Sequence, residues 1–173
     1  ELLYEVAWRP AALDTAEKPA PARGCWLLLC PAARAGQVLR EQLATAGQRV
    51  IVAQPGKSFR RLAPDHYILN PSDGHGYQTL LREAFSDGGA CAGVVHMWSL
   101  DALGQEPATP ADLRRDLELG TYSALFLVQA LAHSGWSILP RLWLVTAGVQ
   151  DIADTSATIS LSQAPLWGLG QAI

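Results

Sequence analysis

The sequence predicts an α/β fold in which a mostly parallel sheet is flanked by helices, and three observations lead to this prediction. Apolar, strand-like runs alternate with helix-like segments from residue 25 onward, which is the pattern of parallel strands joined by helices. The run Leu142-Trp143-Leu144-Val145-Thr146 is apolar almost without alternation, as expected of a parallel strand covered on both faces. A chain of 173 residues is also long enough to bury a core of its own, so a single domain over residues 1–173 is expected.

The N-terminal part divides into a strand and a linker. Residues 1–9 contain the alternating run Tyr4-Glu5-Val6-Ala7-Trp8, which predicts a short strand. Residues 10–24 are rich in alanine and proline with mixed charges, which is typical of a surface linker. Residues 25–173 then form the body of the domain. The chain has no initiator methionine and no signal peptide, so we expect it to be a piece of a longer protein that continues after residue 173.

The body opens with a strand, a helix and a second strand. The predicted strand covers residues 25–30, the helix about 35–46, and the second strand 49–53. Ala46-Gly47 marks the end of the helix, because glycine accepts the left-handed conformation that follows a helix. This segment is one complete unit of a parallel sheet.

Two further strands and a helix follow. His66-Tyr67-Ile68-Leu69-Asn70 predicts a short strand, and Ser72-Asp73 supplies side chains that can cap a helix running to about Ser86. Gly88-Gly89 ends that helix. The apolar run at 93–98 predicts the next strand.

A long helix is predicted from near Asp112 to about His133. One apolar stripe is expected to comprise Leu113, Leu117, Gly120, Ala124, Val128 and Leu131. A second stripe is expected to comprise Leu119, Tyr122 and Phe126, and two apolar faces imply two packing neighbours. The charged residues at the start of the helix are interpreted as a solvated first turn, namely Asp112, Arg114, Arg115, Asp116 and Glu118.

The turn after the first strand lacks the glycines of a dinucleotide site. A pyrophosphate-binding turn needs glycine so that the chain can bend sharply and backbone N–H groups can approach the phosphates. Here the strand runs into Pro31-Ala32-Ala33-Arg34-Ala35-Gly36, which offers one glycine and one proline. We therefore expect this chain to bind no nucleotide cofactor.

Other catalytic patterns fail as well. A tyrosine activated by a lysine four residues later is absent, because Tyr4, Tyr67, Tyr77 and Tyr122 are followed at that spacing by Trp8, Pro71, Leu81 and Phe126. Gly56-Lys57-Ser58 lacks the earlier glycine of a P-loop, and Gly168-x-Gly170 is interpreted as close helix packing. We therefore expect no catalytic residue, and the tyrosines are interpreted as packing residues.

Histidines and cysteines give no metal site or disulfide framework. The histidines are scattered without paired spacing, and His96 falls on a predicted core strand, where a buried histidine is ordinary. Cys25, Cys30 and Cys91 form no C-x-x-C pair and are expected to be buried, reduced thiols.

Composition excludes some partners and indicates another. A net charge of −3 without a long basic run argues against nucleic acid and anionic membranes. Charged residues make up 17% of the chain, fewer than in an ordinary soluble domain. Residues 155–173 carry no charge, so a buried, mostly apolar helix that contacts a second domain is expected there.

Four ordered segments together resemble one protein family. They are Leu3-Tyr4-Glu5-Val6-Ala7-Trp8-Arg9-Pro10, Gly93-Val94-Val95-His96-Met97-Trp98-Ser99-Leu100-Asp101, Pro140-Arg141-Leu142-Trp143-Leu144-Val145-Thr146 and Gln163-Ala164-Pro165-Leu166-Trp167-Gly168-Leu169-Gly170. The chain resembles the structural, non-catalytic N-terminal subdomain of the ketoreductase region of a modular type I polyketide synthase. The resemblance covers nearly the whole chain.

This resemblance implies a truncated Rossmann-like domain that lacks the glycine-rich cofactor loop. It also implies that NADPH and the catalytic residues belong to a partner half, which this domain stabilises and positions within a cytoplasmic multienzyme. The residues expected to pack between the two halves are Tyr4, Val6, Trp8, Leu166, Trp167, Leu169 and Ile173.

Three alternatives stay open. In one, the partner half is an inactive pseudo-ketoreductase, and the pair organises neighbouring dehydratase, enoylreductase or methyltransferase domains. In another, the chain is a protein-binding module without a reductase partner. In the third, it is a free-standing degenerate reductase, which predicts a deep pocket with titratable groups near Pro31, Thr146 and Trp98.

Overall fold

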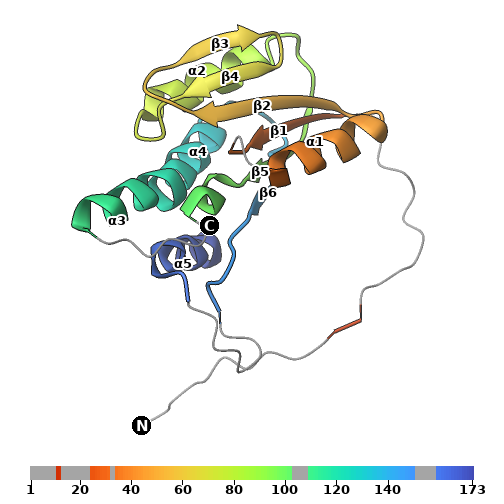
Figure 1. Ribbon diagram of the computed structural model, residues 1–173. Coiled ribbons are helices and arrows are strands. Elements are labelled where there is room, and N and C mark those ends of the chain that lie inside the picture. The colour runs from red at the N-terminus through yellow and green to blue at the C-terminus, as the bar shows by residue number, and fades with distance from the viewer. Residues whose placement is uncertain (1–10, 13–23, 32–33, 103–108, 151–158) are drawn as a thin grey trace.

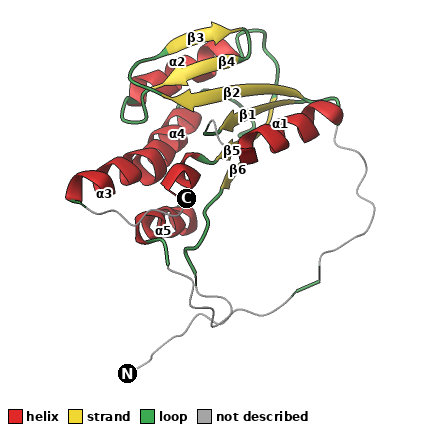
Figure 2. Ribbon diagram, viewed as in Figure 1, coloured by secondary structure: helices red, strands yellow, loops and turns green. Residues whose placement is uncertain are grey.

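The computed structural model describes residues 11–12, 24–31, 34–102, 109–150 and 159–173, which contain a six-stranded sheet with helices on both faces (Figure 1 and Figure 2). The strand order is β3-β4-β2-β1-β5-β6. The strands are β1 (Cys25–Leu29), β2 (Arg49–Pro55), β3 (Arg60–Ala63), β4 (His66–Leu69), β5 (Cys91–His96) and β6 (Arg141–Leu144). All neighbouring strands pair in parallel except β3 and β4, so the predicted fold class is confirmed.

The sheet has a separate core on each face. The helices are α1 (Arg34–Thr45), α2 (Gly74–Ala84), α3 (Pro110–Leu117), α4 (Ser123–Ala132) and α5 (Ala164–Ala172). On one face, Leu27 and Leu29 of β1 pack with α2 and α4. On the other face, Leu28 packs with Leu39 and Leu43 of α1. Alternate residues of the central strand are therefore buried on opposite sides, as a covered parallel sheet requires.

Helix ends follow the local signals in the sequence. Asp73 caps α2, its side chain accepting a hydrogen bond from the His75 backbone N–H at 3.1 Å. Gly47 after α1 has φ +73°, a conformation that favours glycine. The start of α3 is a capping box between Thr109 and Asp112 that the sequence analysis did not identify.

Both edge strands differ from expectation. β3 was not predicted, because its four residues are all exposed and two of them are arginine, so no hydrophobic pattern marks it. β6 was predicted as covered on both faces, but it is the opposite edge of the sheet and its residues are exposed or half-buried in alternation. The strand predicted at 93–98 ends at His96, because Trp98 begins a short 3-10 helix, η1 (Trp98–Ala102).

The long helix contains a π turn, which overturns the predicted phase of its apolar stripes. α3 and α4 are joined by the π-helical segment η2 (Glu118–Tyr122). A π turn absorbs one extra residue and so rotates everything after it around the helix axis. Leu113 is consequently exposed, while Gly120 and Ala124, predicted to share its stripe, are buried.

Asp116 is a second correction on this helix. It was interpreted as part of a solvated first turn, yet it is 5% exposed. Its nearest cation is the Arg115 guanidinium at 3.6 Å from Asp116 Oδ1. The helix turns this carboxyl toward the domain because α3 packs against η1 and the short 3-10 helix η3 (Leu161–Gln163).

Several expectations lie outside the described residues. The predicted strand at 1–9, with Tyr4, Val6 and Trp8, is among them, as is most of the predicted linker. Within the described residues, no helix is both long and apolar enough to cross a membrane.

We predict that Gly93→Ala destabilises the domain. A Cβ at Gly93 would lie 2.6 Å from ring carbons of both Trp26 and Trp143, so two stacked indoles must move. Overpacking of this kind costs about 1–3 kcal/mol of unfolding free energy, measurable by urea denaturation. The matched control is Gly168→Ala in α5, where nothing lies within 4 Å of the added carbon and stability should hold or rise. Equal effects of the two substitutions would contradict the packing assigned to Gly93.

Candidate functional site

Among the described residues at the carboxyl end of the sheet, where this fold class binds ligands, a tryptophan side chain packs across the end of β1. β2 and β5 flank β1 on opposite sides, so the topological switch point lies next to β1. Trp98, which is fully buried, follows β5 and donates from Nε1 to the carbonyl oxygen of Ala53 on β2 at 3.1 Å. Because β1 lies between β5 and β2, the indole spans the end of β1. The backbone N–H groups of Cys30 and Met97 close the same end, at 3.2 Å from Ala53 O and 2.7 Å from Leu29 O.

The residues around the first turn do not fit a dinucleotide. Gly36 is the one glycine there, and a Cβ on it would lie 2.7 Å from the Cβ of Cys30. It therefore has the role of the third glycine of a dinucleotide fingerprint, close packing of helix on strand, without the two glycines that admit the pyrophosphate. Pro31 is buried and has no N–H to offer a phosphate.

The remaining catalytic candidates are accounted for by packing. Tyr67 and Tyr77 are fully buried, and burial raises the pKa of both phenols, in Tyr77 far above its usual range. A Cβ on Gly56 would overlap the side chain of Ile68, so this glycine of the Gly56-Lys57-Ser58 run serves chain packing. Tyr122 is an exception, since it is 45% exposed.

Burial in the fold also accounts for the cysteines and for His96. Cys25 and Cys30 are buried free thiols, and Cys91 is half-buried, with a pKa raised to about 12 by burial. His96 is fully buried on β5, as predicted. Within the described residues, no three His, Cys, Asp or Glu side chains are grouped as metal ligands.

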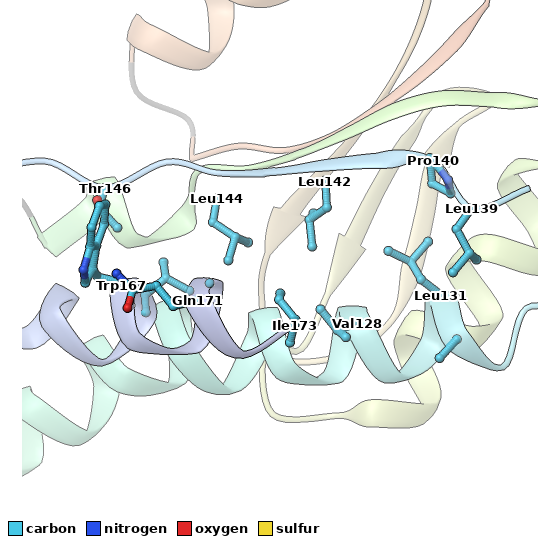
Figure 3. Close-up of a pocket in the computed structure, with 13 residues that line it drawn as sticks. Val128, Leu131, Leu139, Pro140, Leu142, Leu144, Thr146, Trp167, Gln171 and Ile173 are labelled. Carbon is cyan, nitrogen blue, oxygen red and sulfur yellow. The ribbon is translucent and has the colours of Figure 1, made fainter.

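An apolar groove of about 560 Å³ opens instead between β6, α4 and α5 (Figure 3). Leu142 and Leu144 of β6 line one wall, and Val128 and Leu131 of α4 line the floor opposite them. None of its lining residues is charged. A free-standing reductase predicts a deep pocket with titratable groups near Pro31, Thr146 and Trp98. Among the described residues, Thr146 instead lies at one end of this uncharged groove.

The predicted packing residues of α5 lie on or beside this groove. Leu166 is fully buried within the domain, and Leu169 is half-buried. Trp167 and Ile173 both line the groove and remain 39% and 56% exposed. The helix was expected to be buried, and in this chain only one side of it is.

The Gly168-x-Gly170 pattern has two different explanations. A Cβ on Gly170 would lie 3.4 Å from Leu144 Cδ1, which agrees with close packing of α5 on β6. Gly168 has open space around it, so packing within this chain does not explain it.

A second apolar strip runs along the long helix. Leu113, Leu117, Tyr122 and Leu125 follow one another at steps of one helical turn, and the step from Leu117 to Tyr122 is the π turn. Leu113 and Leu125 are each 37% exposed, and Leu117 is half-buried. We call these four residues the helix stripe. The stripe crosses η2, and α5 contacts η2.

Charged groups gather at the other side. Arg49 bridges Asp65 at 2.8 Å and Asp87 at 2.7 Å near the amino ends of the strands. A hydrogen bond from the Gly89 backbone N–H and the Arg49 guanidinium lower the pKa of the Asp87 carboxyl. This cluster is solvated, so it marks a surface that faces water, in contrast to the groove.

Sequence reasoning did not find the groove or the helix stripe. The groove is built from three separate elements, α4, β6 and α5, and depends on how they pack together, so no single motif predicts it. The stripe is visible in the sequence only if a five-residue step is allowed between Leu117 and Tyr122.

Residues 28–137, more than half of the chain, match the family described as "Beta-ketoacyl synthase-like, N-terminal". No match was found among curated proteins. The family's name refers to a synthase, whereas the four segments quoted above resemble a ketoreductase region.

Solved structures share the fold. A multidomain structure of a keto acid-selecting NRPS module, with adenylation, ketoreductase and pseudo Asub domains, matches with a TM-score of 0.80 at 22% identity, over 96% of this chain and 13% of that one. An N-terminal ketoreductase from the macrolactin assembly line matches with a TM-score of 0.56 at 20% identity, over 65% of this chain and 23% of that one. A short chain dehydrogenase from Mycobacterium smegmatis matches with a TM-score of 0.66 at 14% identity, over 94% and 73% of the two chains.

At these identities the solved structures show the fold alone. This chain also spans less than a quarter of the first two matched chains. Together, the family match and the shared fold confirm the predicted resemblance to the structural subdomain of a synthase ketoreductase region.

We predict that the stability of the domain depends on the filled end of the sheet. Trp98→Ala should lower the unfolding free energy by about 3–5 kcal/mol, because it leaves a cavity at the end of β1. Trp98→Phe keeps most of the volume and loses the bond to Ala53 O, so it should cost about 1–2 kcal/mol. Trp143→Ala removes the same side chain from a position that is 36% exposed, and should cost clearly less than Trp98→Ala in the same urea titration. If the two alanine variants were equally stable, the end of the sheet would not be closed as described.

Proposed function

Since this chain belongs to the beta-ketoacyl synthase-like N-terminal family, we propose that it is the non-catalytic structural subdomain of a polyketide synthase ketoreductase region inside a cytoplasmic multienzyme. In this role it binds the catalytic ketoreductase half, which holds NADPH and reduces the β-ketoacyl chain. The observation that carries the proposal is the contrast between a filled carboxyl end of the sheet and an open, uncharged groove beside α5.

The chemistry of the surface favours a protein partner. The groove and α5 offer aliphatic and indole surface with no charge, and desolvating such a surface stabilises a complex without leaving buried charges unpaired. Trp167 is the strongest candidate anchor, because it is a half-exposed tryptophan that lines the apolar groove, and tryptophan is enriched in binding hot spots. Ile173 and Leu169 flank it on the same helix.

The choice of partner rests on the larger proteins in which this fold occurs. Nearly all of this chain aligns with 13% of a module chain that includes a ketoreductase. A domain of this size within a much larger chain has neighbours against which an apolar face can pack. The catalytic ketoreductase half is therefore the occupant we propose for the groove and α5.

A second form of the proposal concerns an inactive partner. A pseudo-ketoreductase half could use the same face, and the pair would then organise other domains without reducing the chain. The apolar face favours neither form, so the activity of the assembled pair distinguishes them.

We predict that this chain alone shows no saturable NADPH binding. The first turn has one glycine, Gly36, which packs against Cys30, and Pro31 offers no N–H to a pyrophosphate, so a fluorescence titration should give only a linear, nonspecific change. Saturation in the micromolar range would overturn the proposal that NADPH belongs to the partner.

We predict that Trp167→Ala weakens the complex with a purified catalytic ketoreductase half by about tenfold to a hundredfold, as expected for loss of an anchoring tryptophan. Calorimetry measures the affinity, and NADPH-dependent reduction of a β-ketoacyl substrate reports whether the assembled pair is active. Leu62→Ala is the control, because Leu62 is 53% exposed on β3 at the far edge of the sheet. Equal affinities of the two variants would exclude α5 as the docking helix.

A further inference from the structure

The π turn decides which side chains of the long helix face the partner. Twelve steps separate Leu113 from Leu125, which in an unbroken α-helix places them about 120° apart around the axis. The extra residue of η2 leaves an effective eleven steps, and the two leucines then lie about 20° apart. The exposures in the structure agree, since both leucines are 37% exposed while Gly120 and Ala124 are buried. The helix stripe therefore exists because of the π turn.

A buried serine holds the π turn from inside the helix. Ser123, which is fully buried, directly follows η2, and its hydroxyl donates to the backbone carbonyls of Leu119 and Gly120, the latter at 3.0 Å. Serine bonds of this kind to preceding carbonyls bend or distort a helix. The Ser123 backbone N–H donates to Glu118 O and Gly120 O instead of Leu119 O, and the Ser123 hydroxyl supplies a donor to the Leu119 carbonyl.

A histidine of the sheet fixes that serine. His96 Nε2 lies 2.7 Å from Ser123 Oγ, and the two residues are 27 positions apart in the sequence. A hydroxyl has one proton, and here it points to the two carbonyls, so Ser123 Oγ accepts and His96 Nε2–H donates. His96 Nδ1 has no hydrogen-bond partner among the described residues, which fits a neutral ring with its proton on Nε2.

We propose that His96 and Ser123 are positioning residues for partner binding: through the π turn they hold Tyr122 and Leu125 in line with Leu113 and Leu117. This inference rests on the proposed function, because it adds the helix stripe to the face that binds the catalytic half. Without the pair, the Leu119 carbonyl loses its side-chain donor, so the π turn opens more readily and Tyr122 and Leu125 are held less firmly in line with Leu113 and Leu117.

The pair also makes the π turn sensitive to acid. Burial lowers the pKa of His96 from its usual value to about 4, and no charged side chain among the described residues opposes that effect. The nearby titratable group is Tyr77 of α2, which makes a side-chain hydrogen bond with Ser123 and whose hydroxyl donates to Pro71 O at 3.0 Å. Because the folded pKa is depressed, the neutral ring stabilises the fold above the unfolded pKa of about 6.5, and this stabilisation is lost as pH falls toward 4.

The test compares three variants of the full chain. His96→Leu and Ser123→Ala remove the hydrogen bond, whereas His96→Gln keeps an N–H donor near the position of Nε2. We expect amide hydrogen exchange over residues 118–123 to rise about tenfold in the first two variants relative to residues 74–84, and affinity for the catalytic half to fall about tenfold. His96→Gln should restore both. Unchanged hydrogen exchange in His96→Leu and Ser123→Ala would overturn the proposal. So would faster exchange with unchanged affinity for the catalytic half, given that the wild-type chain binds it.

A measurement on the wild-type chain covers the case in which a variant does not fold. The ring resonances of His96 in the wild-type chain should titrate with a pKa of about 4, and the amide shifts of residues 119–123 should follow the same curve in wild type and lose it in His96→Gln. Shifts that follow an ordinary histidine pKa, or no shift between pH 7 and pH 4, would contradict the link between His96 and the π turn. If the wild-type chain does not bind the catalytic half at all, the proposed function fails, while exchange and NMR shifts still decide whether His96 holds the turn.

Discussion

The indole of Trp98, hydrogen-bonded to Ala53 O across the end of β1, is the contact on which the rest of the structure depends. It occupies the place where a parallel sheet of this kind receives its ligand, and it joins β5 to β2 around the central strand. The one glycine of the first turn, Gly36, packs close to Cys30, so its role in the described structure is helix packing. The glycine-poor first turn in the sequence thus agrees with the packing of Trp98 at the end of β1.

The two edges of the sheet differ in charge and exposure. β3 is short, fully exposed and carries Arg60 and Arg61, which are the features that keep an edge strand from pairing with other chains. β6 presents leucine and tryptophan after its first residue and borders the groove. The domain therefore carries charge at the β3 edge and an apolar groove beside the β6 edge, which favours the proposed docking of a partner beside β6.

Much of this fold follows from local signals in the sequence. The strands around β1, the cap at Asp73 and the stop at Gly47 were predictable because each depends on side chains within a few residues. β3 was not, since an exposed strand of charged residues has no hydrophobic period. The phase of the long helix was mispredicted because the π turn depends on Ser123 and on His96, which the sequence places far away. The exposure of Trp167 depends on which neighbours are present, and a single chain does not encode that locally.

The most direct test of the account is a hydrogen-exchange footprint of this chain with and without the catalytic ketoreductase half, in the presence of NADPH. The account predicts protection over α5, β6 and the helix stripe, and no change in residues 28–31 and 96–102 at the carboxyl end of the sheet. The contradicting result is protection of the carboxyl end of the sheet, or of β3, while α5 and the helix stripe are unaffected. That result would mean that this chain does not bind the catalytic half as a non-catalytic structural subdomain.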